Sequence, residues 1–194
     1  SGVGTLFLID SDTVAPSNIN RQSIALLSTV GQKKTDVMKE KIADINPECS
    51  VFTSSAFVLP ENLREVFSSC PVKPDYIIDA IDSLKDKADL ILRATALPKE
   101  ITFVSSMGAA LRRDPFMVRK AEFWKVDGDP LARALRKKFK KNKTFPRRKF
   151  QCVFSEEKPM QNMSDQRLVE DEWTSTKPQI NGSLCHITAT FGMA

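Results

Sequence analysis

The stretch Thr5-Leu6-Phe7-Leu8-Ile9-Asp10-Ser11-Asp12 decides the fold. Residues 6–9 are continuously apolar, which is typical of a strand buried on both faces of a parallel sheet. The strand closes on an acidic pair, Asp10 and Asp12. In nucleotide-binding α/β folds, an aspartate at the carboxyl end of such a strand holds a ribose hydroxyl. The stretch alone leaves two interpretations of Asp10 open, a ribose ligand and a plain strand-ending residue.

A polar loop and a helix start follow this strand. Residues 17–22 read Ser-Asn-Ile-Asn-Arg-Gln, and Lys34 comes after Val-Gly-Gln-Lys near the start of a helix. A guanidinium and an ammonium that converge on one crevice suit a triphosphate. The competing interpretations are a capped turn with a surface arginine and an exposed helix lysine. Asn20 is expected to support the loop, and Asp12 is a candidate for orienting it.

Strand-like and helical segments alternate along the first half of the chain. Residues 51–55, 76–78 and 101–104 read as strands, and helical apolar spacing recurs between them. This alternation predicts a doubly wound α/β fold with a mostly parallel sheet. Asp79 and Asp82 follow the strand at 76–78. Asp82 is the candidate magnesium ligand, because magnesium is held by one or two carboxylates plus substrate phosphates; Asp79 is expected to support the loop.

Four ordered motifs resemble the ubiquitin-activating-enzyme-like superfamily, which includes the molybdopterin and thiamine sulfur-carrier activators. The motifs are Leu8-Ile9-Asp10-x-Asp12, Asn18-x-Asn20-Arg21-Gln22, Val30-Gly31-x-x-Lys34 and Ile78-Asp79-Ala80-Ile81-Asp82. One branch, the tRNA threonylcarbamoyladenosine dehydratases, is similar over essentially the whole chain. Its further matches lie at 46–49, 79–83, 129–132, 152–156 and 188–192.

The resemblance implies ATP-dependent dehydration, or cyclisation, of threonylcarbamoyladenosine in tRNA through an acyl-adenylate. It implies ATP and Mg²⁺ as cofactors, with Asp82 as metal ligand and Arg21, Lys34 and Asp82 as catalytic residues. The implied ATP-binding residues are Asp10, Asp12, Asn18, Arg21, Gln22 and Lys34. The expected partners are tRNA, a second copy in a homodimer and a cysteine desulfurase sulfur-transfer system. Two alternatives remain, a sulfur-carrier-protein adenylyltransferase and a catalytically inactive tRNA-binding remnant.

Composition narrows these alternatives. The 194 residues are 41% apolar and 27% charged, with a net charge of +5, which indicates a soluble globular protein and hints at a polyanionic partner. No apolar run approaches the roughly 20 residues of a membrane helix, so no membrane partner is expected. The four cysteines are scattered without a Cys-x-x-Cys pair, which argues against a zinc-bearing sulfur-carrier activator and favours a reducing, cytoplasmic location. Cys152 and Cys185 are interpreted as packing residues rather than nucleophiles, and His186 likewise.

The organisation of the chain is expected to be a single domain with two parts. Residues 1–110 are predicted to form a Rossmann-like nucleotide-binding core. The family's first strand and its Gly-x-Gly-x-x-Gly turn are absent from it, so this core is expected to be incomplete at its amino end. Residues 111–194 are predicted to form an irregular basic region for tRNA or substrate and the start of a C-terminal helix. Within this part, residues 116–119 are expected to be extended, and Asp129-Pro130 is expected to start a helix, with an aspartate cap and a proline in the first turn.

Residues 133–149 are the compositional outlier, because they hold ten cations and no acid. A run of this kind is either a solvated helix face or a contact for a phosphate backbone. We interpret it as the tRNA contact. The candidate nucleic-acid-binding residues are Arg133, Arg136, Lys137, Lys138, Lys140, Lys141, Lys143, Arg147 and Arg148.

Overall fold

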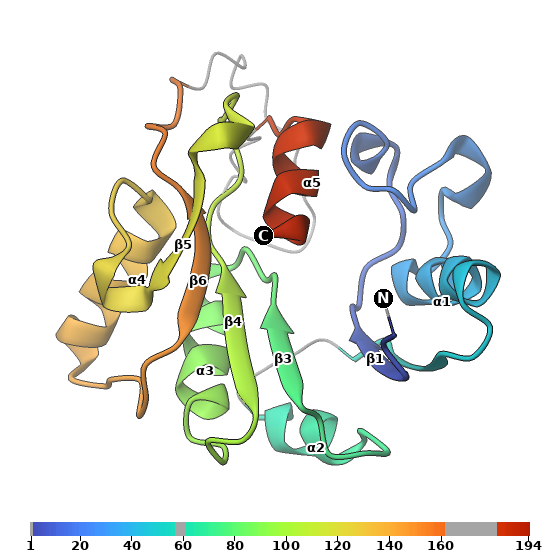
Figure 1. Ribbon diagram of the computed structural model, residues 1–194, viewed down its shortest axis with the longest axis horizontal. Coiled ribbons are helices and arrows are strands. Elements are labelled where there is room, and N and C mark those ends of the chain that lie inside the picture. Colours follow the sequence, from blue (N-terminus) through green and yellow to red (C-terminus); the bar gives the residue numbers. More distant parts are fainter. Residues whose placement is uncertain (1, 57–60, 162–181) are drawn as a thin grey trace.

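The computed structural model describes residues 2–56, 61–161 and 182–194. Its strands form two sheets (Figure 1). The first is a parallel pair, β1 (Thr5–Ile9) and β2 (Ser50–Ser54), with Thr5 opposite Ser50. The second has the order β3-β4-β6-β5, and only β5 runs antiparallel to its neighbour. Its strands are β3 (Tyr76–Asp79), β4 (Thr102–Ser106), β5 (Val118–Glu122) and β6 (Gln151–Ser155).

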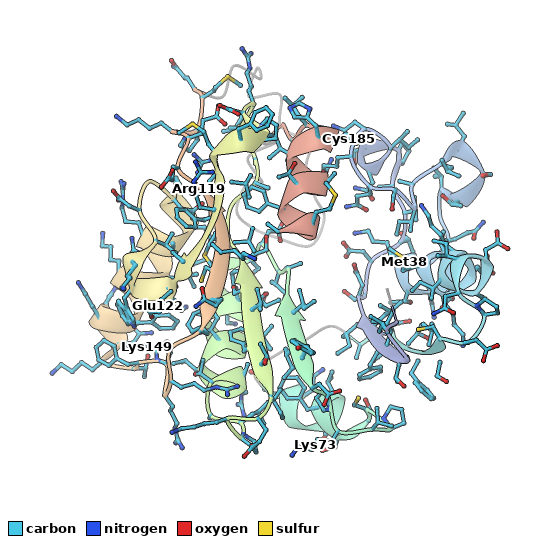
Figure 2. The ribbon with its side chains drawn as sticks, in the orientation of Figure 1. Met38, Lys73, Arg119, Glu122, Lys149 and Cys185 are labelled. Atoms are coloured by element: carbon cyan, nitrogen blue, oxygen red, sulfur yellow. The ribbon has the colours of Figure 1, made fainter. Side chains whose placement is uncertain are left out.

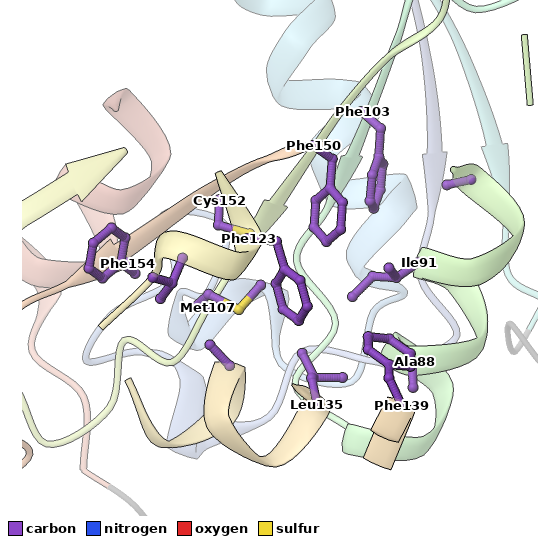
Figure 3. Close-up of a cluster of buried hydrophobic side chains, with 13 residues drawn as sticks. Ala88, Ile91, Phe103, Met107, Phe123, Leu135, Phe139, Phe150, Cys152 and Phe154 are labelled. Atoms are coloured by element: carbon purple, nitrogen blue, oxygen red, sulfur yellow. The ribbon is translucent and has the colours of Figure 1, made fainter. Parts of the chain in front are cut away.

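Helices cover both faces of the four-stranded sheet, as the alternation of side chains along β6 shows. Cys152 and Phe154 join the main core with α3 and α4, whereas Val153 packs with α5 on the other face. In the main core the Phe123 and Phe150 rings stack with their centroids 5.0 Å apart (Figure 3). The helices are α1 (Lys34–Ile45), α2 (Leu63–Ser68), α3 (Leu84–Ala94), α4 (Pro130–Asn142) and α5 (Cys185–Met193). None of the helices in the described ranges is long and apolar enough to cross a membrane.

The start and end of α4 follow from local chemistry. Asp129 is the N-cap and accepts a hydrogen bond from the Ala132 N–H at 2.8 Å, and Pro130 occupies the first turn. The helix ends at Asn142, and the next residue, Lys143, adopts a left-handed conformation with φ of 52°. The helix start predicted at Asp129-Pro130 is therefore confirmed.

Several sequence expectations differ from the structure. The α/β class is confirmed, but among the described residues the strands form two sheets instead of one, because β1 bonds only to β2 and β3 only to β4. Residues 6–9 of β1 are consequently half-buried rather than buried on both faces. β6, expected only as a family motif, is a central strand. The stretch 116–119, expected to be extended, begins within the 3-10 turn Pro115–Met117 and continues into β5 from Val118.

The parallel strands β3, β4 and β6 end at one edge of their sheet. In open α/β sheets, ligands bind outside the carboxyl ends of the strands. A ligand is therefore expected to bind at this edge and at the end of β1.

Candidate nucleotide site

An ammonium lies over the acidic end of β1. The Lys34 Nζ is 2.6 Å from Asp12 Oδ2 and 4.0 Å from Asp10 Oδ2. The Asp12 N–H donates to Asp10 Oδ1 at 2.8 Å, which shapes the turn after the strand. The side chain of Lys34 is 13% exposed, whereas those of Asp10 and Asp12 are 43% and 63% exposed. A constrained cation thus faces two solvent-accessible carboxylates, a pair open to a ligand that carries both hydroxyls and phosphates.

The backbone explains why Lys34 rather than Lys33 occupies this position. Thr13 and Lys33 form an antiparallel bridge, and the Lys34 N–H donates to the Asp12 carbonyl at 3.1 Å. Lys34 is also the first residue of α1. The loop after β1 and the start of α1 are therefore joined directly, with Lys34 turned toward the acidic pair.

The loop that carries Arg21 is folded around Asn18. Asn18 is 8% exposed, and its Oδ1 accepts from the Ala15 N–H at 3.0 Å, while its carbonyl accepts from the Arg21 and Gln22 N–H groups. Its side-chain oxygen therefore supports the loop, and its assignment as an ATP ligand stays a prediction. Gln22 is half-buried beside it.

Arg21 is positioned by neighbouring oxygens. One of its terminal nitrogens donates to the Ser17 carbonyl at 2.8 Å and to Asn20 Oδ1 at 2.9 Å. Asn20 Nδ2 in turn donates to the Ser183 carbonyl at 3.0 Å, and the Thr188 hydroxyl on α5 donates to the Arg21 carbonyl. Asn20 is thus a supporting residue, as the sequence indicated. Figure 1 shows α5 between the four-stranded sheet and this loop, and Figure 2 shows Cys185 at the α5 end that adjoins it.

A buried ion pair lies at the carboxyl end of β3. The Lys87 Nζ is 2.9 Å from Asp79 Oδ2, and neither side chain is exposed. Asp79 also accepts from the Ser105 hydroxyl at 2.7 Å and from the Ile81 N–H at 2.9 Å. Lys87 donates a further hydrogen bond to the Ile81 carbonyl at 2.7 Å. The network therefore ties the short loop between β3 and α3 to both of these elements and to β4.

The network positions Asp82, which follows Ile81 directly. Asp82 is exposed at the same edge of the sheet. No group of three acidic, histidine or cysteine side chains able to hold a metal ion occurs among the described residues. A single exposed carboxylate fits magnesium, which commonly keeps waters and substrate phosphates as its other ligands.

Sequence reasoning missed Lys87 and Ser105. Lys87 stands on the buried face of α3, next to Ala88 and one turn before Ile91. The sequence did offer a signal for Lys87, because it shows a lysine within the apolar stripe of a helix, shortly after two aspartates at the end of a strand. A buried lysine requires a partner of opposite charge, and these aspartates were the candidates. The distance in sequence between Asp79 and Ser105 offered no comparable signal.

A second buried ion pair joins the sheet to α4. Arg112 Nη2 lies 3.4 Å from Asp129 Oδ2, which also accepts from the Gly108 N–H at 3.2 Å. Burial raises the pKa of Asp129, and the Ala132 N–H and the Arg112 charge oppose that shift. Burial likewise lowers the pKa of Arg112 against the attraction of Asp129. The pair holds the amino end of α4 beside the segment that leaves β4.

The cysteines and the histidine do not form a nucleophilic centre. Cys152 is fully buried in the main core, and burial raises the pKa of its thiol far above the ordinary range. The thiolate needed for nucleophilic attack is therefore disfavoured. Cys185 is exposed, and the His186 ring lies 2.9 Å from the Arg113 carbonyl rather than beside a cysteine. The prediction that Cys152 is a packing residue is confirmed; Cys185 is not buried.

The basic segment contains cations that bond to backbone carbonyls and cations that line a hollow on α4. Arg136 donates to the carbonyls of Phe123 and Val126, and Arg148 donates to those of Ala94 and Ile101. These two guanidiniums hold backbone segments together. Five basic side chains of α4 alone line a shallow hollow of ≈ 560 Å³. They are Arg133, Arg136, Lys137, Lys140 and Lys141.

The fold is α/β with mostly parallel strands, and pairs of acidic and basic side chains lie at the carboxyl ends of β1 and β3, as in nucleotide-binding α/β proteins. Residues 1–190 match the model of the ThiF family, and the chain belongs to that family. It is 41% identical to the tRNA threonylcarbamoyladenosine dehydratase of Bacillus subtilis (strain 168), over 86% of this chain and 63% of that protein. The dehydratase of Haemophilus influenzae is 38% identical, over 99% of this chain and 73% of that protein.

A solved relative has the same fold. The structure of E. coli tRNA N6-threonylcarbamoyladenosine dehydratase in complex with AMP superposes with a TM-score of 0.81 at 35% identity, covering 99% of this chain and 72% of that one. The same enzyme in complex with ATP gives a TM-score of 0.79. The resemblance to this family that the sequence motifs indicated is confirmed.

Proposed function

We propose that this protein dehydrates threonylcarbamoyladenosine in tRNA at the expense of ATP. The observation that carries the proposal is the cluster of Lys34, Asp12 and Asp10 at the end of β1. It offers carboxylates for a ribose and a cation for phosphates, with the Lys34 ammonium no more than 4.0 Å from either carboxylate. The similarity to dehydratases, one of them solved with ATP, supports this reading of the cluster.

In this proposal Asp10 binds the ribose hydroxyls and Arg21 and Lys34 bind the triphosphate. Lys34 exchanges its contact with Asp12 for a phosphate oxygen when ATP enters, and Asp12 then orients the loop. Gln22 adds a neutral donor beside Arg21, while Asn18 contributes through the loop that it folds. Asp82 would hold a magnesium ion, which neutralises phosphate charge when bound.

The chemistry requires activation of a carboxylate, because hydroxide leaves poorly at neutral pH. One carboxylate oxygen of the threonylcarbamoyl group attacks the α-phosphate of ATP, and pyrophosphate departs. The carbamoyl group then attacks the activated carbonyl and AMP departs with that oxygen, which closes a ring with net loss of one water. Positioning and charge neutralisation are the main demands on such a site, and Arg21 and Lys34 meet them.

The reaction itself is tested with tRNA that carries threonylcarbamoyladenosine. The protein, expressed from its entire coding sequence, is incubated with this tRNA, ATP and Mg²⁺, and the digested nucleosides are analysed by mass spectrometry. We expect the modified nucleoside to lose one water while AMP and pyrophosphate accumulate. Unmodified tRNA is the control and should not stimulate AMP release. An unchanged nucleoside despite ATP binding would contradict the proposal and favour a sulfur-carrier protein as substrate.

The proposal includes α4 as a contact for the tRNA backbone. Replacing Lys137, Lys140 and Lys141 with alanine should weaken tRNA binding without changing ATP affinity, because these exposed cations line the basic hollow. Each lost phosphate contact should reduce the slope of log affinity against log salt by roughly 0.7–0.9. Fluorescence titration of tRNA at several KCl concentrations measures the slope.

The matched control for this triple variant removes three exposed lysines elsewhere, Lys39, Lys73 and Lys99. It changes the net charge equally, so it should leave the slope near the wild-type value. Equal slopes for the two triple variants would show that α4 presents only a solvated face.

Further parts of the proposal rest on the family resemblance. They are a homodimer, coupling to a cysteine desulfurase, a cytoplasmic location and a division of labour near residue 110 between nucleotide and tRNA contacts. β1 and β3 each have one edge without a strand partner in the described residues.

A further inference from the structure

Two aromatic side chains form an exposed pair at the end of the basic segment. Trp124 is 40% exposed and Phe145 is 52% exposed, and their ring centroids lie 6.3 Å apart at an interplanar angle of 41°. They come from separate segments, the 3-10 turn Phe123–Lys125 and the chain that follows α4. Two large apolar rings are thus held together at the surface.

The pair is anchored in the main core. The Trp124 ring packs edge-on against Phe123, with centroids 5.2 Å apart, and Phe123 is fully buried against Phe139 and Phe150 (Figure 3). Arg136 donates to the Phe123 carbonyl, and its guanidinium carbon lies 5.9 Å from the Phe123 ring centroid. Rings held this way lose little conformational freedom when a flat ligand stacks on them.

Exposed cations flank the Phe145 member of the pair. Lys143 and Arg147 lie two residues to either side of Phe145 and are exposed. Arg136 belongs both to this anchor and to the basic hollow on α4. Residues 130–155 contain no acidic side chain. Apolar rings beside exposed cations suit a ligand that joins flat apolar groups to a polyanionic backbone.

We propose that Trp124 and Phe145 form a platform on which one unpaired base of an RNA strand stacks, while the strand's phosphates follow the cations of α4. Bases in duplex RNA are already stacked, so only an unpaired nucleotide offers its face to a protein ring. The inference rests on the proposed function in taking the RNA to be tRNA.

The platform lies at the end of the sheet opposite to Asp82. β5 runs antiparallel to β6, and Glu122 at its end is opposite Gln151, the first residue of β6. Asp129, at the other end of α4, is bonded to Gly108 just beyond the carboxyl end of β4. The 13 residues of α4 thus span roughly 20 Å between the two edges. The stacked base is therefore a nucleotide other than the reacting adenosine.

The test uses a fluorescein-labelled single-stranded RNA octamer and a blunt RNA duplex of the same length as probes. The chain has two tryptophans, so a Trp173→Phe background leaves Trp124 as the sole tryptophan. In that background we expect the octamer to quench tryptophan fluorescence. Replacing both Trp124 and Phe145 with alanine should weaken octamer binding by about 10- to 100-fold, the range of one lost stacking contact. The salt slope should not change, because no phosphate contact is lost.

Three controls complete the design. Trp124→Phe and Phe145→Tyr keep a ring at each position and should retain most of the affinity. Phe116→Ala removes a phenylalanine that is 86% exposed on another turn and should have no effect. Single Phe145→Ala serves if the double variant does not fold.

Three results would each overturn the platform. The first is unchanged octamer affinity in the alanine variants, even if the octamer quenches Trp124 fluorescence in the parent protein. The others are a reduced salt slope in the alanine variants and an equal loss of affinity for the duplex. Octamer binding is independent of dehydration, so failure of the enzymatic proposal leaves this readout intact. If the wild-type protein dehydrates tRNA, the platform variants should raise KM and leave kcat unchanged.

Discussion

Replacing Asp82 with alanine is expected to reduce ATP-dependent turnover by about 30- to 1000-fold, which corresponds to roughly 2–4 kcal/mol of lost electrostatic stabilisation. Asp82 is exposed at the carboxyl end of β3, and the loop around it is held by buried groups that the substitution does not touch. The fold should therefore persist. Turnover is measured as AMP release with threonylcarbamoylated tRNA over a range of Mg²⁺ concentrations.

Asp82→Asn should behave like the alanine variant, since it retains size but not charge. The matched control is Asp75→Ala, an exposed aspartate at the opposite end of the same strand. That control should keep wild-type turnover. If Asp82→Ala turned over as fast as the wild type at limiting Mg²⁺, Asp82 would have no part in the mechanism.

Lys87→Met is expected to lower the free energy of unfolding by roughly 3–5 kcal/mol, because it leaves the Asp79 carboxylate buried without its counter-charge. Neither partner of the pair is exposed to solvent, so water cannot replace the missing ammonium. Urea unfolding followed by circular dichroism measures the change. Lys85→Met removes an exposed lysine from the same helix and should shift the value by no more than about 0.5 kcal/mol.

The double variant Asp79→Asn/Lys87→Met should recover part of the lost stability, since it removes both charges. It should not recover turnover, because the Ile81 carbonyl still lacks the hydrogen bond that fixes the loop of Asp82. The double variant thus distinguishes the effect of the ion pair on stability from its effect on turnover. A Lys87→Met protein as stable as the wild type would show that the pair does not hold this loop.

Local chemistry made much of the fold predictable. The apolar run before Asp10 indicated β1, and the aspartate and proline at residues 129–130 indicated the start of α4. Both features depend on residues within a few positions of one another, which a sequence displays directly. The spacing between Asp12 and Lys34 was read from a family motif, and the structure brings the two side chains together.

Long-range pairing was not predictable in the same way. The position of β6 between β4 and β5 depends on hydrogen bonds between strands far apart in sequence. Neither periodicity nor turn chemistry identifies such a partner. The half-burial of β1 and the exposure of Tyr76 and Ile78 on β3 were not predictable for the same reason, because the burial of a strand depends on what packs against it.

The sequence by itself determined the α/β class, the acidic end of β1, and the family to which these motifs belong. Only the tertiary structure decided which charged side chains are buried in ion pairs, which bond to the backbone and which are exposed to a ligand. It buries Lys87 against Asp79, assigns Arg136 and Arg148 to backbone carbonyls, and leaves Lys137, Lys140 and Lys141 on a shared surface. The physical reason is that a charged residue looks the same in any sequence, whereas its burial and its partners are set by segments that meet only in the folded chain.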